Sequence, residues 1–412
     1  MLRSHLTAAT LLRVSAEGAA TALVLTVQAR TGDAASAGFV QTAMTLPYVL
    51  SGPVIGHALD RTDRPRRLVI ALACGYAVAI ALLMMSAGRS PLVLVLMVAA
   101  VVGCVEPVVA ALTSLLPRFV PTERLSRAYG LEASSYNVAA IAGPGLAALV
   151  AAFVGGGQAG TVTVAAAVLG LLFLPLLRIP PPEARPPVAR ERTRTGVAQV
   201  VTGGLSVLGK NRVLRALTVS TMFAWFGYGG FAVAAVLLGQ DIGAGPAAGG
   251  QLIAFFAVGS LVGTLAASRW LTPGRSERAI MAGLLGFGTA VAALAVVPSL
   301  PWAWAVCVGA GLAEGPLFAA TLMLRQRESP PDRLGQVNTT GGSLKIGASA
   351  GGAALTGVFA GQLGADGLML SIAVFQFVGA ALWLWLLSSG PSVPASSPSG
   401  RRRGSRTRPG RG

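Results

Sequence analysis

The stretch GHALDRTDRPRR, residues 56–67, gathers two aspartates and four arginines between two long apolar runs. Charged side chains are costly inside hydrocarbon, so this cluster cannot continue either run. The stretch therefore predicts a polar loop between two segments with apolar surroundings. The nature of those surroundings decides the fold.

The composition of the whole chain identifies the surroundings as lipid. Of its 412 residues, 53% are hydrophobic and only 11% are charged, and the mean hydropathy is +0.68. Apolar runs of about 20 residues recur along the chain, and each is long enough to cross a hydrocarbon core of about 30 Å. The sequence therefore predicts an all-α polytopic membrane protein.

Twelve membrane spans are predicted, in two sets of six. The first set covers about residues 6–29, 37–59, 68–87, 92–116, 128–154 and 158–177. The second set covers about residues 214–239, 247–267, 279–297, 302–324, 335–362 and 368–387. We expect two six-helix bundles, at residues 1–178 and 214–387, joined by a cytoplasmic linker at 179–213 and followed by a disordered basic tail at 388–412.

The basic residues predict which side of the membrane each loop faces. The chain has 32 Lys and Arg residues against 15 Asp and Glu residues. Nearly all of the basic residues lie at the termini, in the proline-rich linker and in the even-numbered loops. This positive-inside pattern places both termini and those loops in the cytoplasm. The net charge of +17 is thus a topology signal with some attraction to anionic headgroups. No nucleic-acid partner is expected, since no aromatic residues interleave with the arginines of the tail.

Three pairs of short motifs repeat between the halves with almost the same spacing. PTERLS and PPDRLG begin at Pro121 and Pro330, 209 residues apart. Glu106 and Glu314, each followed closely by a proline, are 208 residues apart, and GHALDR and GTLAAS are 207 residues apart. Six plus six spans in parallel repeat is the layout of a secondary transporter whose halves are related by an axis along the membrane normal.

The loop at residues 56–67 resembles the signature that the major facilitator superfamily carries between helices two and three. That signature is a glycine, then Asp-Arg, then a basic cluster, and its positions are filled by Gly56, Asp60, Arg61, Arg64, Arg66 and Arg67. Two positions depart from it: Asp63 stands where the family usually has a second glycine, and Pro65 interrupts the basic run. The resemblance extends over the spans and the linker, and it implies transport by alternating access.

The resemblance also implies that Asp60 acts as a latch between the halves. A carboxylate at a helix end can accept hydrogen bonds from free N–H groups at the start of a neighbouring helix, where the helix dipole favours an anion. In the family that neighbour is helix eleven, while Arg61 and Arg64 pair with nearby carboxylates. The alternative is that Asp60 caps local structure and the arginines only set topology. Ala267 and Ser268 stand at the corresponding second-half positions, so any latch is one-sided.

Span five carries Gly143, Pro144 and Gly145 well inside an apolar run. Proline removes a backbone hydrogen bond and glycine permits close packing, so this helix is expected to kink against a partner. The tripeptide and its surroundings resemble drug and metabolite exporters with an antiporter motif, although Ala139 and Ala147 occupy positions where that motif often has glycine. A packing kink without a role in exchange is the alternative.

Ionisable residues inside the spans are candidate transport residues, because such groups are costly in a bilayer. They are Arg13 and Glu17 in span one, Glu106 in span four, Glu132 in span five, Glu314 in span ten and Lys345 in span eleven. In the superfamily, helices one, four, seven and ten line the central cavity. We expect Glu17 about 16 Å into its helix, near mid-membrane, and Glu132 only about 7 Å in, near the interface. Arg13 and Glu17 are four residues apart, so mutual neutralisation is an alternative to a transport role.

Glu106 and Glu314 are the first candidates for proton coupling. The repeat places both about 20 Å from the outer ends of their helices, so they should face each other across the cavity. Burial raises the pKa of a carboxyl group and a nearby cation lowers it, so such a group can release a proton when a cationic substrate binds. Pro107 frees backbone acceptors next to Glu106, so Glu106 is slightly preferred over Glu314 as the coupling residue. The alternative is that one glutamate pairs with Lys345 or Arg13 and holds the bundle together.

Span seven contributes an aromatic cluster that would suit a lipophilic ligand, made of Phe223, Trp225, Phe226 and Tyr228. Aromatic faces beside carboxylates favour apolar contact and cation–π attraction. Ordinary packing or an interfacial aromatic belt is the alternative.

Together these features predict proton-coupled efflux, by antiport, of a lipophilic small molecule or cation such as a drug or secondary metabolite. The expected partners are this substrate, protons and the lipid bilayer of the cell membrane, with no cofactor and no metal, and the protein is expected to be a monomer. An importer of a small metabolite and a non-transporting receptor or scaffold are the alternatives. An enzyme is disfavoured, because the chain has only two histidines, His5 and His57, and no nucleophile beside a base.

Reporter fusions test the predicted topology. Fusions after Arg67, after Arg194 and at the C-terminus should report the cytoplasm, because basic loops stay inside. Fusions after Asp33 and Asp241 should report the outside. A reversed result within this set would overturn the assignment of spans.

Overall fold

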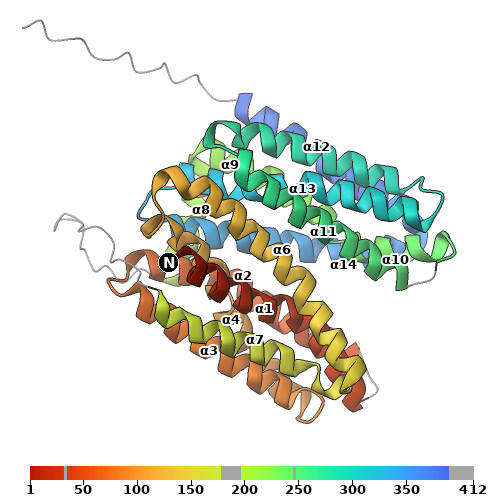
Figure 1. Cartoon of the computed structure of the whole chain (residues 1–412), viewed down its shortest axis with the longest axis horizontal. Helices are drawn as coiled ribbons and strands as arrows, with labels where there is room; N and C mark the ends of the chain where they lie inside the picture. The colour runs from red at the N-terminus through yellow and green to blue at the C-terminus, as the bar shows by residue number, and fades with distance from the viewer. Residues whose placement is uncertain (32–34, 178–195, 245–246, 389–412) are drawn as a thin grey trace, which may run out of the picture.

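The computed structural model describes residues 1–31, 35–177, 196–244 and 247–388, and these residues are helical almost throughout. Figure 1 shows two groups of helices side by side, with the first half of the chain in red to yellow and the second half in green to blue. A chain in lipid must satisfy its backbone N–H and C=O groups internally, and a helix does so within one segment. The all-α prediction is confirmed.

The first half contains the six predicted spans, some of them built from more than one helical segment. Its elements are α1 (Leu2–Thr31), α2 (Ala35–Arg61), α3 (Pro65–Ser86), α4 (Leu92–Val105), α5 (Val108–Ala111), η1 (Leu112–Arg118), α6 (Thr122–Phe153), η2 (Gly156–Gln158), α7 (Gly160–Phe173) and η3 (Leu174–Leu176). The elements α4, α5 and η1 together form the fourth span. The break after α4 coincides with Pro107, which has no N–H to donate to the preceding turn.

The second half repeats this arrangement. Its elements are α8 (Val197–Lys210), α9 (Arg212–Tyr228), α10 (Phe231–Asp241), α11 (Ala247–Trp270), η5 (Pro273–Arg275), α12 (Ser276–Leu294), α13 (Leu300–Glu328) and α14 (Leu334–Ser388). The seventh span is divided into α9 and α10 at two glycines, Gly229 and Gly230, a break that the sequence analysis does not predict.

Ten of the described helical stretches are long and apolar enough to cross a membrane. The 55-residue α14 holds two spans, because Gly364 breaks it with a φ of 62°, a conformation that favours glycine. With 27 residues, α2 also has spanning length, but its polar residues, Gln41 and Thr45 among them, keep it out of the apolar group. Counting α14 as two and adding α2 gives the twelve predicted spans.

The proline in the loop at residues 56–67 has a simple backbone explanation. In the structure α2 ends at Arg61 and α3 begins at Pro65. The first helical position lacks an intrahelical acceptor for its N–H, so proline costs nothing there and its fixed φ suits the helix. Pro65 therefore starts the third span where it interrupts the basic run.

The predicted linker and tail are only partly described. Residues 178–195 and 389–412 lie outside the described residues, whereas the end of the linker forms α8. The side-chain amide of Gln336 in α14 donates a 2.5 Å hydrogen bond to the carbonyl oxygen of Val200 in α8. Leu208 of α8 packs with Leu214 and Val337. The linker thus contributes a helix that packs against the second half.

Large apolar side chains stay exposed on the outside of the bundle. Examples are Val78, Leu82 and Met85 on α3, and Val93 and Met97 on α4. An apolar face of this extent would drive association in water, whereas hydrocarbon solvates it. The exposed surface therefore fits a bilayer.

Glycines set the closest helix contacts of the second half. Gly259 and Gly263 lie four residues apart on α11, and Gly311 and Gly315 lie four residues apart on α13. A Cβ at Gly315 would lie 2.5 Å from the carbonyl oxygen of Ser260, so the two backbones nearly touch. Small residues at this spacing allow such packing between helices in membranes.

Replacing Gly311 by leucine should destabilise the protein by about 1–3 kcal/mol, because any side chain there overlaps the α11 backbone. Gly309→Leu is the matched control, since a Cβ at Gly309 would meet no atom within 4 Å. Thermal unfolding of the purified variants in detergent measures the difference. Equal melting temperatures for the two variants would contradict the close contact.

Candidate functional site

One end of the bundle gathers most of the charged loop residues that the structure describes, and we call it the basic end. Arg118 there donates to the carbonyl oxygen of Leu59 at 3.2 Å, and Asn211 donates to the Glu328 carboxylate at 3.3 Å. The start of α1 belongs to the same end, since Leu2 packs on the apolar cluster that contains Leu116. We call the opposite end the distal end.

The Asp60 carboxylate joins the two halves at the basic end. Its Oδ1 accepts a hydrogen bond from the Gly335 amide and its Oδ2 accepts one from the Gln336 amide, both at 2.8 Å. Because α14 begins at Leu334, these amides have no acceptor within their own helix, and the helix dipole also favours an anion there. Gly56, one turn earlier on α2, lies against Gly335 so closely that a side chain would overlap it. Hydrogen bonds from the start of helix eleven to this aspartate are what the family resemblance implies, and the role of the contact as a latch stays a prediction.

The arginines of the same loop behave differently from the family expectation. Among the described residues neither Arg61 nor Arg64 forms an ion pair, so the predicted pairing with nearby carboxylates is wrong for this structure. Both side chains are exposed, where an ion pair contributes little. Arg66 donates to the Pro175 carbonyl oxygen and ties the start of α3 to η3, while Arg67 is exposed.

A buried charge network joins α1, η1 and α6. The Arg13 guanidinium donates to Glu132 Oε1 at 2.5 Å, to Thr113 Oγ1 at 3.1 Å and to Ser135 Oγ. The other carboxylate oxygen of Glu132 lies 3.2 Å from His5 Nε2. The Arg13 and Glu132 side chains are 1% and 0% exposed. A buried ion pair persists only when further hydrogen bonds satisfy its polar atoms, as most are here.

Glu132 is fully buried and lies about 15 Å from the start of α6, deeper in its helix than the roughly 7 Å that the predicted span gives. Arg13 forms its ion pair with Glu132, so the alternative in which Arg13 and Glu17 neutralise each other is not seen as an ion pair among the described residues. One i, i+4 carboxylate offers fewer acceptors to a guanidinium than Glu132 and two neighbouring hydroxyls do. A signal was present in the sequence: Arg13 lies eleven residues after the start of α1 and Glu132 ten residues after the start of α6, so opposite charges stand at matching depths.

Glu17 and Glu106 have no hydrogen-bond or ion-pair partner for their carboxyl groups in the described part of the chain. Glu17 is exposed and Glu106 is half-buried, yet protein atoms surround both and the two carboxylates are close enough to repel each other. A side chain that is surrounded and still accessible lines an internal opening. Glu106 stands at the break between α4 and α5, as Pro107 predicts.

Glu314 is connected through a hydroxyl to the opposite half. Ser260 Oγ lies 2.5 Å from Glu314 Oε2 and 3.1 Å from Asn137 Oδ1 of α6. A hydroxyl has one proton, so Ser260 donates to one of these oxygens at a time. That Glu314 faces Glu106 across the cavity stays a prediction.

Lys345 of α14 lies against aromatic rings. Its Nζ is 4.0 Å from the ring centroid of Trp225 and 5.1 Å from that of Phe318, and the residue is 8% exposed. Aromatic faces attract a cation, most strongly where water is excluded. Lys345 lies close enough to Glu314 for electrostatic attraction, but the described residues include no ion pair between them. The predicted alternative, a glutamate held by Lys345, is therefore not seen.

The predicted aromatic cluster of span seven divides into two parts. Trp225 contacts the lysine and lies 5.3 Å, between ring centroids, from Tyr228. Phe226 instead packs on Phe375 at 5.0 Å, and Phe223 is 40% exposed. Two of the four residues thus lie near the candidate site and two serve packing or lipid contact.

The glycine-proline motif of α6 packs against α1. A Cβ at Gly143 would lie 2.6 Å from the amide nitrogen of Gly18, and a Cβ at Gly145 would meet no atom within 4 Å. The helix α6 continues through Pro144 without a break. This geometry accounts for the motif by close packing, and its role in exchange stays a prediction.

Further hydrogen bonds between the halves lie on the same side as Asp60. Thr264 Oγ1 of α11 accepts from Ser134 Oγ at 3.0 Å and from Asn137 Nδ2 at 3.3 Å. The backbone of Ser268 lies against Gly130 so closely that a side chain there would overlap it. The structure is therefore closed at the basic end, while Glu17 remains accessible.

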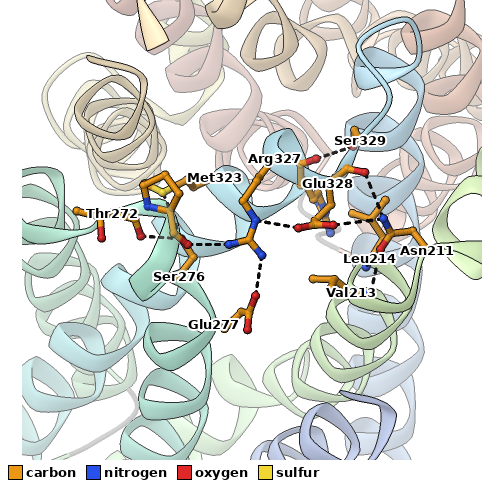
Figure 2. A network of polar contacts seen from close by, with 12 residues as sticks. Asn211, Val213, Leu214, Thr272, Ser276, Glu277, Met323, Arg327, Glu328 and Ser329 are labelled. Carbon is orange, nitrogen blue, oxygen red and sulfur yellow. Dashed lines mark hydrogen bonds and ion pairs between the residues drawn. The ribbon is translucent and has the colours of Figure 1, made fainter. Parts of the chain in front are cut away.

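The second half has a polar network of its own at the basic end, which the sequence analysis misses (Figure 2). Arg327 of α13 donates to Glu277 Oε1 at 2.6 Å, to Glu328 Oε1 at 2.8 Å and to the Pro273 carbonyl oxygen at 2.8 Å. Asn211 accepts the first amides of α9 and also donates to Glu328. The network fastens the loop between α11 and α12 to α13 and α9, within one half. No sequence signature marks it, because its members come from three separate parts of the chain, at the ends of different helices.

A metal centre would need several ligating side chains together. In residues 1–31, 35–177, 196–244 and 247–388 no group of three His, Cys, Asp or Glu residues is placed to hold a metal ion.

Known proteins resemble the chain over most of its length. The sequence profile of the Major Facilitator Superfamily matches residues 6–344 and 217–410. The chain is 27% identical over 365 residues to "Uncharacterized MFS-type transporter y4rN" of Sinorhizobium fredii, covering 87% of this chain and 88% of that protein. It is 27% identical over 356 residues to the multidrug efflux pump Tap of Mycolicibacterium fortuitum, covering 83% and 85%.

A solved structure shares the fold. The human organic anion transporter MFSD10 (TETRAN) superposes with a TM-score of 0.77 at 17% identity, over 93% of this chain and 99% of that one. The likeness at this identity concerns the fold, and it agrees with the two groups of helices in Figure 1. The profile match and the fold together show that the chain belongs to the Major Facilitator Superfamily, as a multi-pass transporter of small molecules and not an enzyme.

Proposed function

We propose that the protein exports a lipophilic small molecule in exchange for protons, by alternating access. The observation that carries the proposal is the pair of carboxyl groups, Glu17 and Glu106, that line an internal opening without partners in the described chain. A bilayer protein keeps such groups at a cost, which a role in proton exchange explains. The closed basic end supplies one of the two states that alternating access needs.

The basic end is proposed to face the cytoplasm. Its loops carry the arginines that the positive-inside rule retains on that side, including Arg61, Arg64 and Arg118. With this orientation the structure is outward-facing, because its closed end lies inside. Both termini are then cytoplasmic.

The exported substrate is proposed to be lipophilic. Trp225 and Tyr228 provide aromatic surface near Lys345 and Glu314. The similarity to the multidrug efflux pump Tap supports efflux, drug substrates and a link to drug resistance as proposals for this chain. An importer of a small metabolite would use the same fold, and transport in vesicles of opposite orientation separates the two.

The exchange is proposed to use Glu106 and Glu314 in different surroundings. Glu106 has no partner among the described residues and stands beside a helix break, whereas Glu314 has a hydroxyl donor and the field of Lys345. A carboxyl group without a partner can exchange its proton with water or with a substrate in the opening. A carboxylate with a donor and a cation nearby keeps its charge more easily. The two groups could therefore carry the proton at different stages.

Glu106→Gln should abolish accumulation of substrate in inverted vesicles with an imposed proton gradient, because an amide carries no exchangeable charge. Downhill exchange of substrate should continue, since the cavity keeps its shape. Glu314→Gln should have the same effect if both groups are needed. Unchanged, pH-dependent accumulation by both single variants and by the double variant would exclude these residues from coupling.

Asp60→Asn should leave the protein folded and inserted but lower transport about tenfold or more. The amide loses one of the two charge-assisted acceptors that hold α14, and hydrogen bonds to charged groups contribute roughly 1.5–3 kcal/mol. Asp241→Asn is the control, since Asp241 is exposed and its carboxylate has no hydrogen-bond partner in the described chain. Transport rates in vesicles, normalised to the inserted protein, measure the effect. Near-normal transport by Asp60→Asn would refute the latch.

A further inference from the structure

A second arginine is buried near the basic end, and it has no counterpart to the network around Arg13. Arg325 of α13 is 4% exposed, and its Nε and Nη2 atoms have no hydrogen-bond partner in the described chain. Its guanidinium lies against Gly341 of α14, where a Cβ would be 2.7 Å from Cζ. The glycine leaves the space that this flat cation occupies. Arg325 is thus held in place by shape and not by hydrogen bonds.

Asn338 of α14 is also buried without a hydrogen-bond partner among the described residues. It is 8% exposed, and neither Nδ2 nor Oδ1 has a hydrogen-bond partner among the described residues. A buried amide without partners destabilises a protein, because it loses its bonds to water and gains none. Two adjacent elements therefore each keep a costly polar side chain at the basic end.

The register of the two helices brings these side chains to neighbouring turns. The antiparallel α13 and α14 meet where Phe318 contacts Lys345, 5.1 Å from ring centroid to Nζ. Seven residues, or two turns, toward the basic end along each helix lead to Arg325 and Asn338 on the same faces. The Arg325 guanidinium packs on Gly341, less than one turn from Asn338, so we expect the two unpartnered groups on neighbouring turns, with Asn338 about 10 Å from Lys345 along α14.

The chemistry of these groups selects an anion with oxygen acceptors. A guanidinium offers a planar fork of donors that fits a carboxylate, and the asparagine amide adds donors of its own. The positive charge of Lys345 lies two turns deeper. In contrast, the charge of Arg13 is already balanced by Glu132. Glu314 lies close enough to Lys345 to offset one of the two positive charges, so the region between Arg325 and Lys345 keeps one positive charge without a counter-ion among the described residues.

We propose that Arg325 and Asn338 form a binding site for the oxyanion group of the substrate, which enters from the basic end when Asp60 releases α14. The site rests on the proposed function, which is export of a lipophilic small molecule. It narrows that molecule to an organic acid whose carboxylate binds Arg325 and whose apolar body reaches Trp225 and Phe318. The distance of about 10 Å between Asn338 and Lys345 suits an amphiphilic aromatic acid.

Binding to the full-length protein in nanodiscs tests the site directly. The probes are 1-naphthoate, inorganic sulfate and the cation tetraphenylphosphonium, and affinity is measured by calorimetry. Naphthoate should bind the wild type, and more tightly to Asp60→Asn, whose basic end opens more readily. Arg325→Gln and Asn338→Leu should weaken naphthoate binding about tenfold or more, the loss expected for hydrogen bonds to a charged group. Tetraphenylphosphonium binding should change less than twofold in both variants.

Arg327→Gln is the matched control, because Arg327 is two residues away but bonded to Glu277 and Glu328. It should leave naphthoate binding within twofold. Asn338→Leu keeps the volume of the side chain and removes its unpartnered atoms, so its melting temperature should be no lower than that of the wild type. This variant keeps the test valid if Arg325→Gln does not fold.

The outcomes separate the site from the transport function. Naphthoate affinity unchanged in Asn338→Leu and Arg325→Gln, or no naphthoate binding by either the wild type or Asp60→Asn, would overturn the site. Sulfate that competes in the wild type but not in Arg325→Gln supports it and adds inorganic oxyanions to its ligands. Sulfate competition that survives Arg325→Gln overturns it. If naphthoate binding depends on Arg325 but vesicles do not export naphthoate, the binding site is supported and only the proposed export function is contradicted.

Discussion

The high free energy of a charge in hydrocarbon governs the interior of this protein. Each buried charge is handled in one of a few ways. Arg13 and Glu132 neutralise each other within a hydrogen-bonded network, and Lys345 lies on aromatic faces. Glu17 and Glu106 stay accessible to an internal opening, so water can solvate them when they are charged. Only the Arg13–Glu132 pair has its charges balanced within the protein. The other charged groups can still gain from a ligand or a proton, so they are the candidate sites of transport.

The contacts within each half differ in kind from those between the halves. Within the second half, Gly311 and Gly315 bring the backbones of α11 and α13 into van der Waals contact. Between the halves, Asp60 and Thr264 use hydrogen bonds that water can replace when the halves separate. This division lets each bundle move as a unit while the interface opens and closes. In α8 the carbonyl oxygen of Val200 accepts a hydrogen bond from the side chain of Gln336, and the backbone amide of Gln336 binds Asp60, so the linker contacts the closed interface directly.

The sequence predicted the structure correctly where a local pattern has a single physical explanation. The spans followed from apolar length, and the contact of Asp60 with helix eleven followed from a signature motif and the free amides at a helix start. It failed where a side chain had several partners within reach. Arg13 has a carboxylate four residues away on its own helix, but it binds Glu132, more than a hundred residues distant in the chain. The aromatic residues of span seven also divided between the cavity and the packed exterior, because their directions depend on how α9 rotates against its neighbours.

By itself the sequence determined the all-α class, the twelve spans and the two-half repeat, because hydropathy and the satisfaction of backbone hydrogen bonds act along a single segment. The tertiary structure alone decided which charges are paired. Glu132 became a buried partner, Glu17 remained accessible, and Arg325 and Asn338 were left without partners in the described chain. Pairing depends on distances between side chains of different helices, and a shift of one turn changes those distances by about 5 Å, more than a hydrogen bond can bridge.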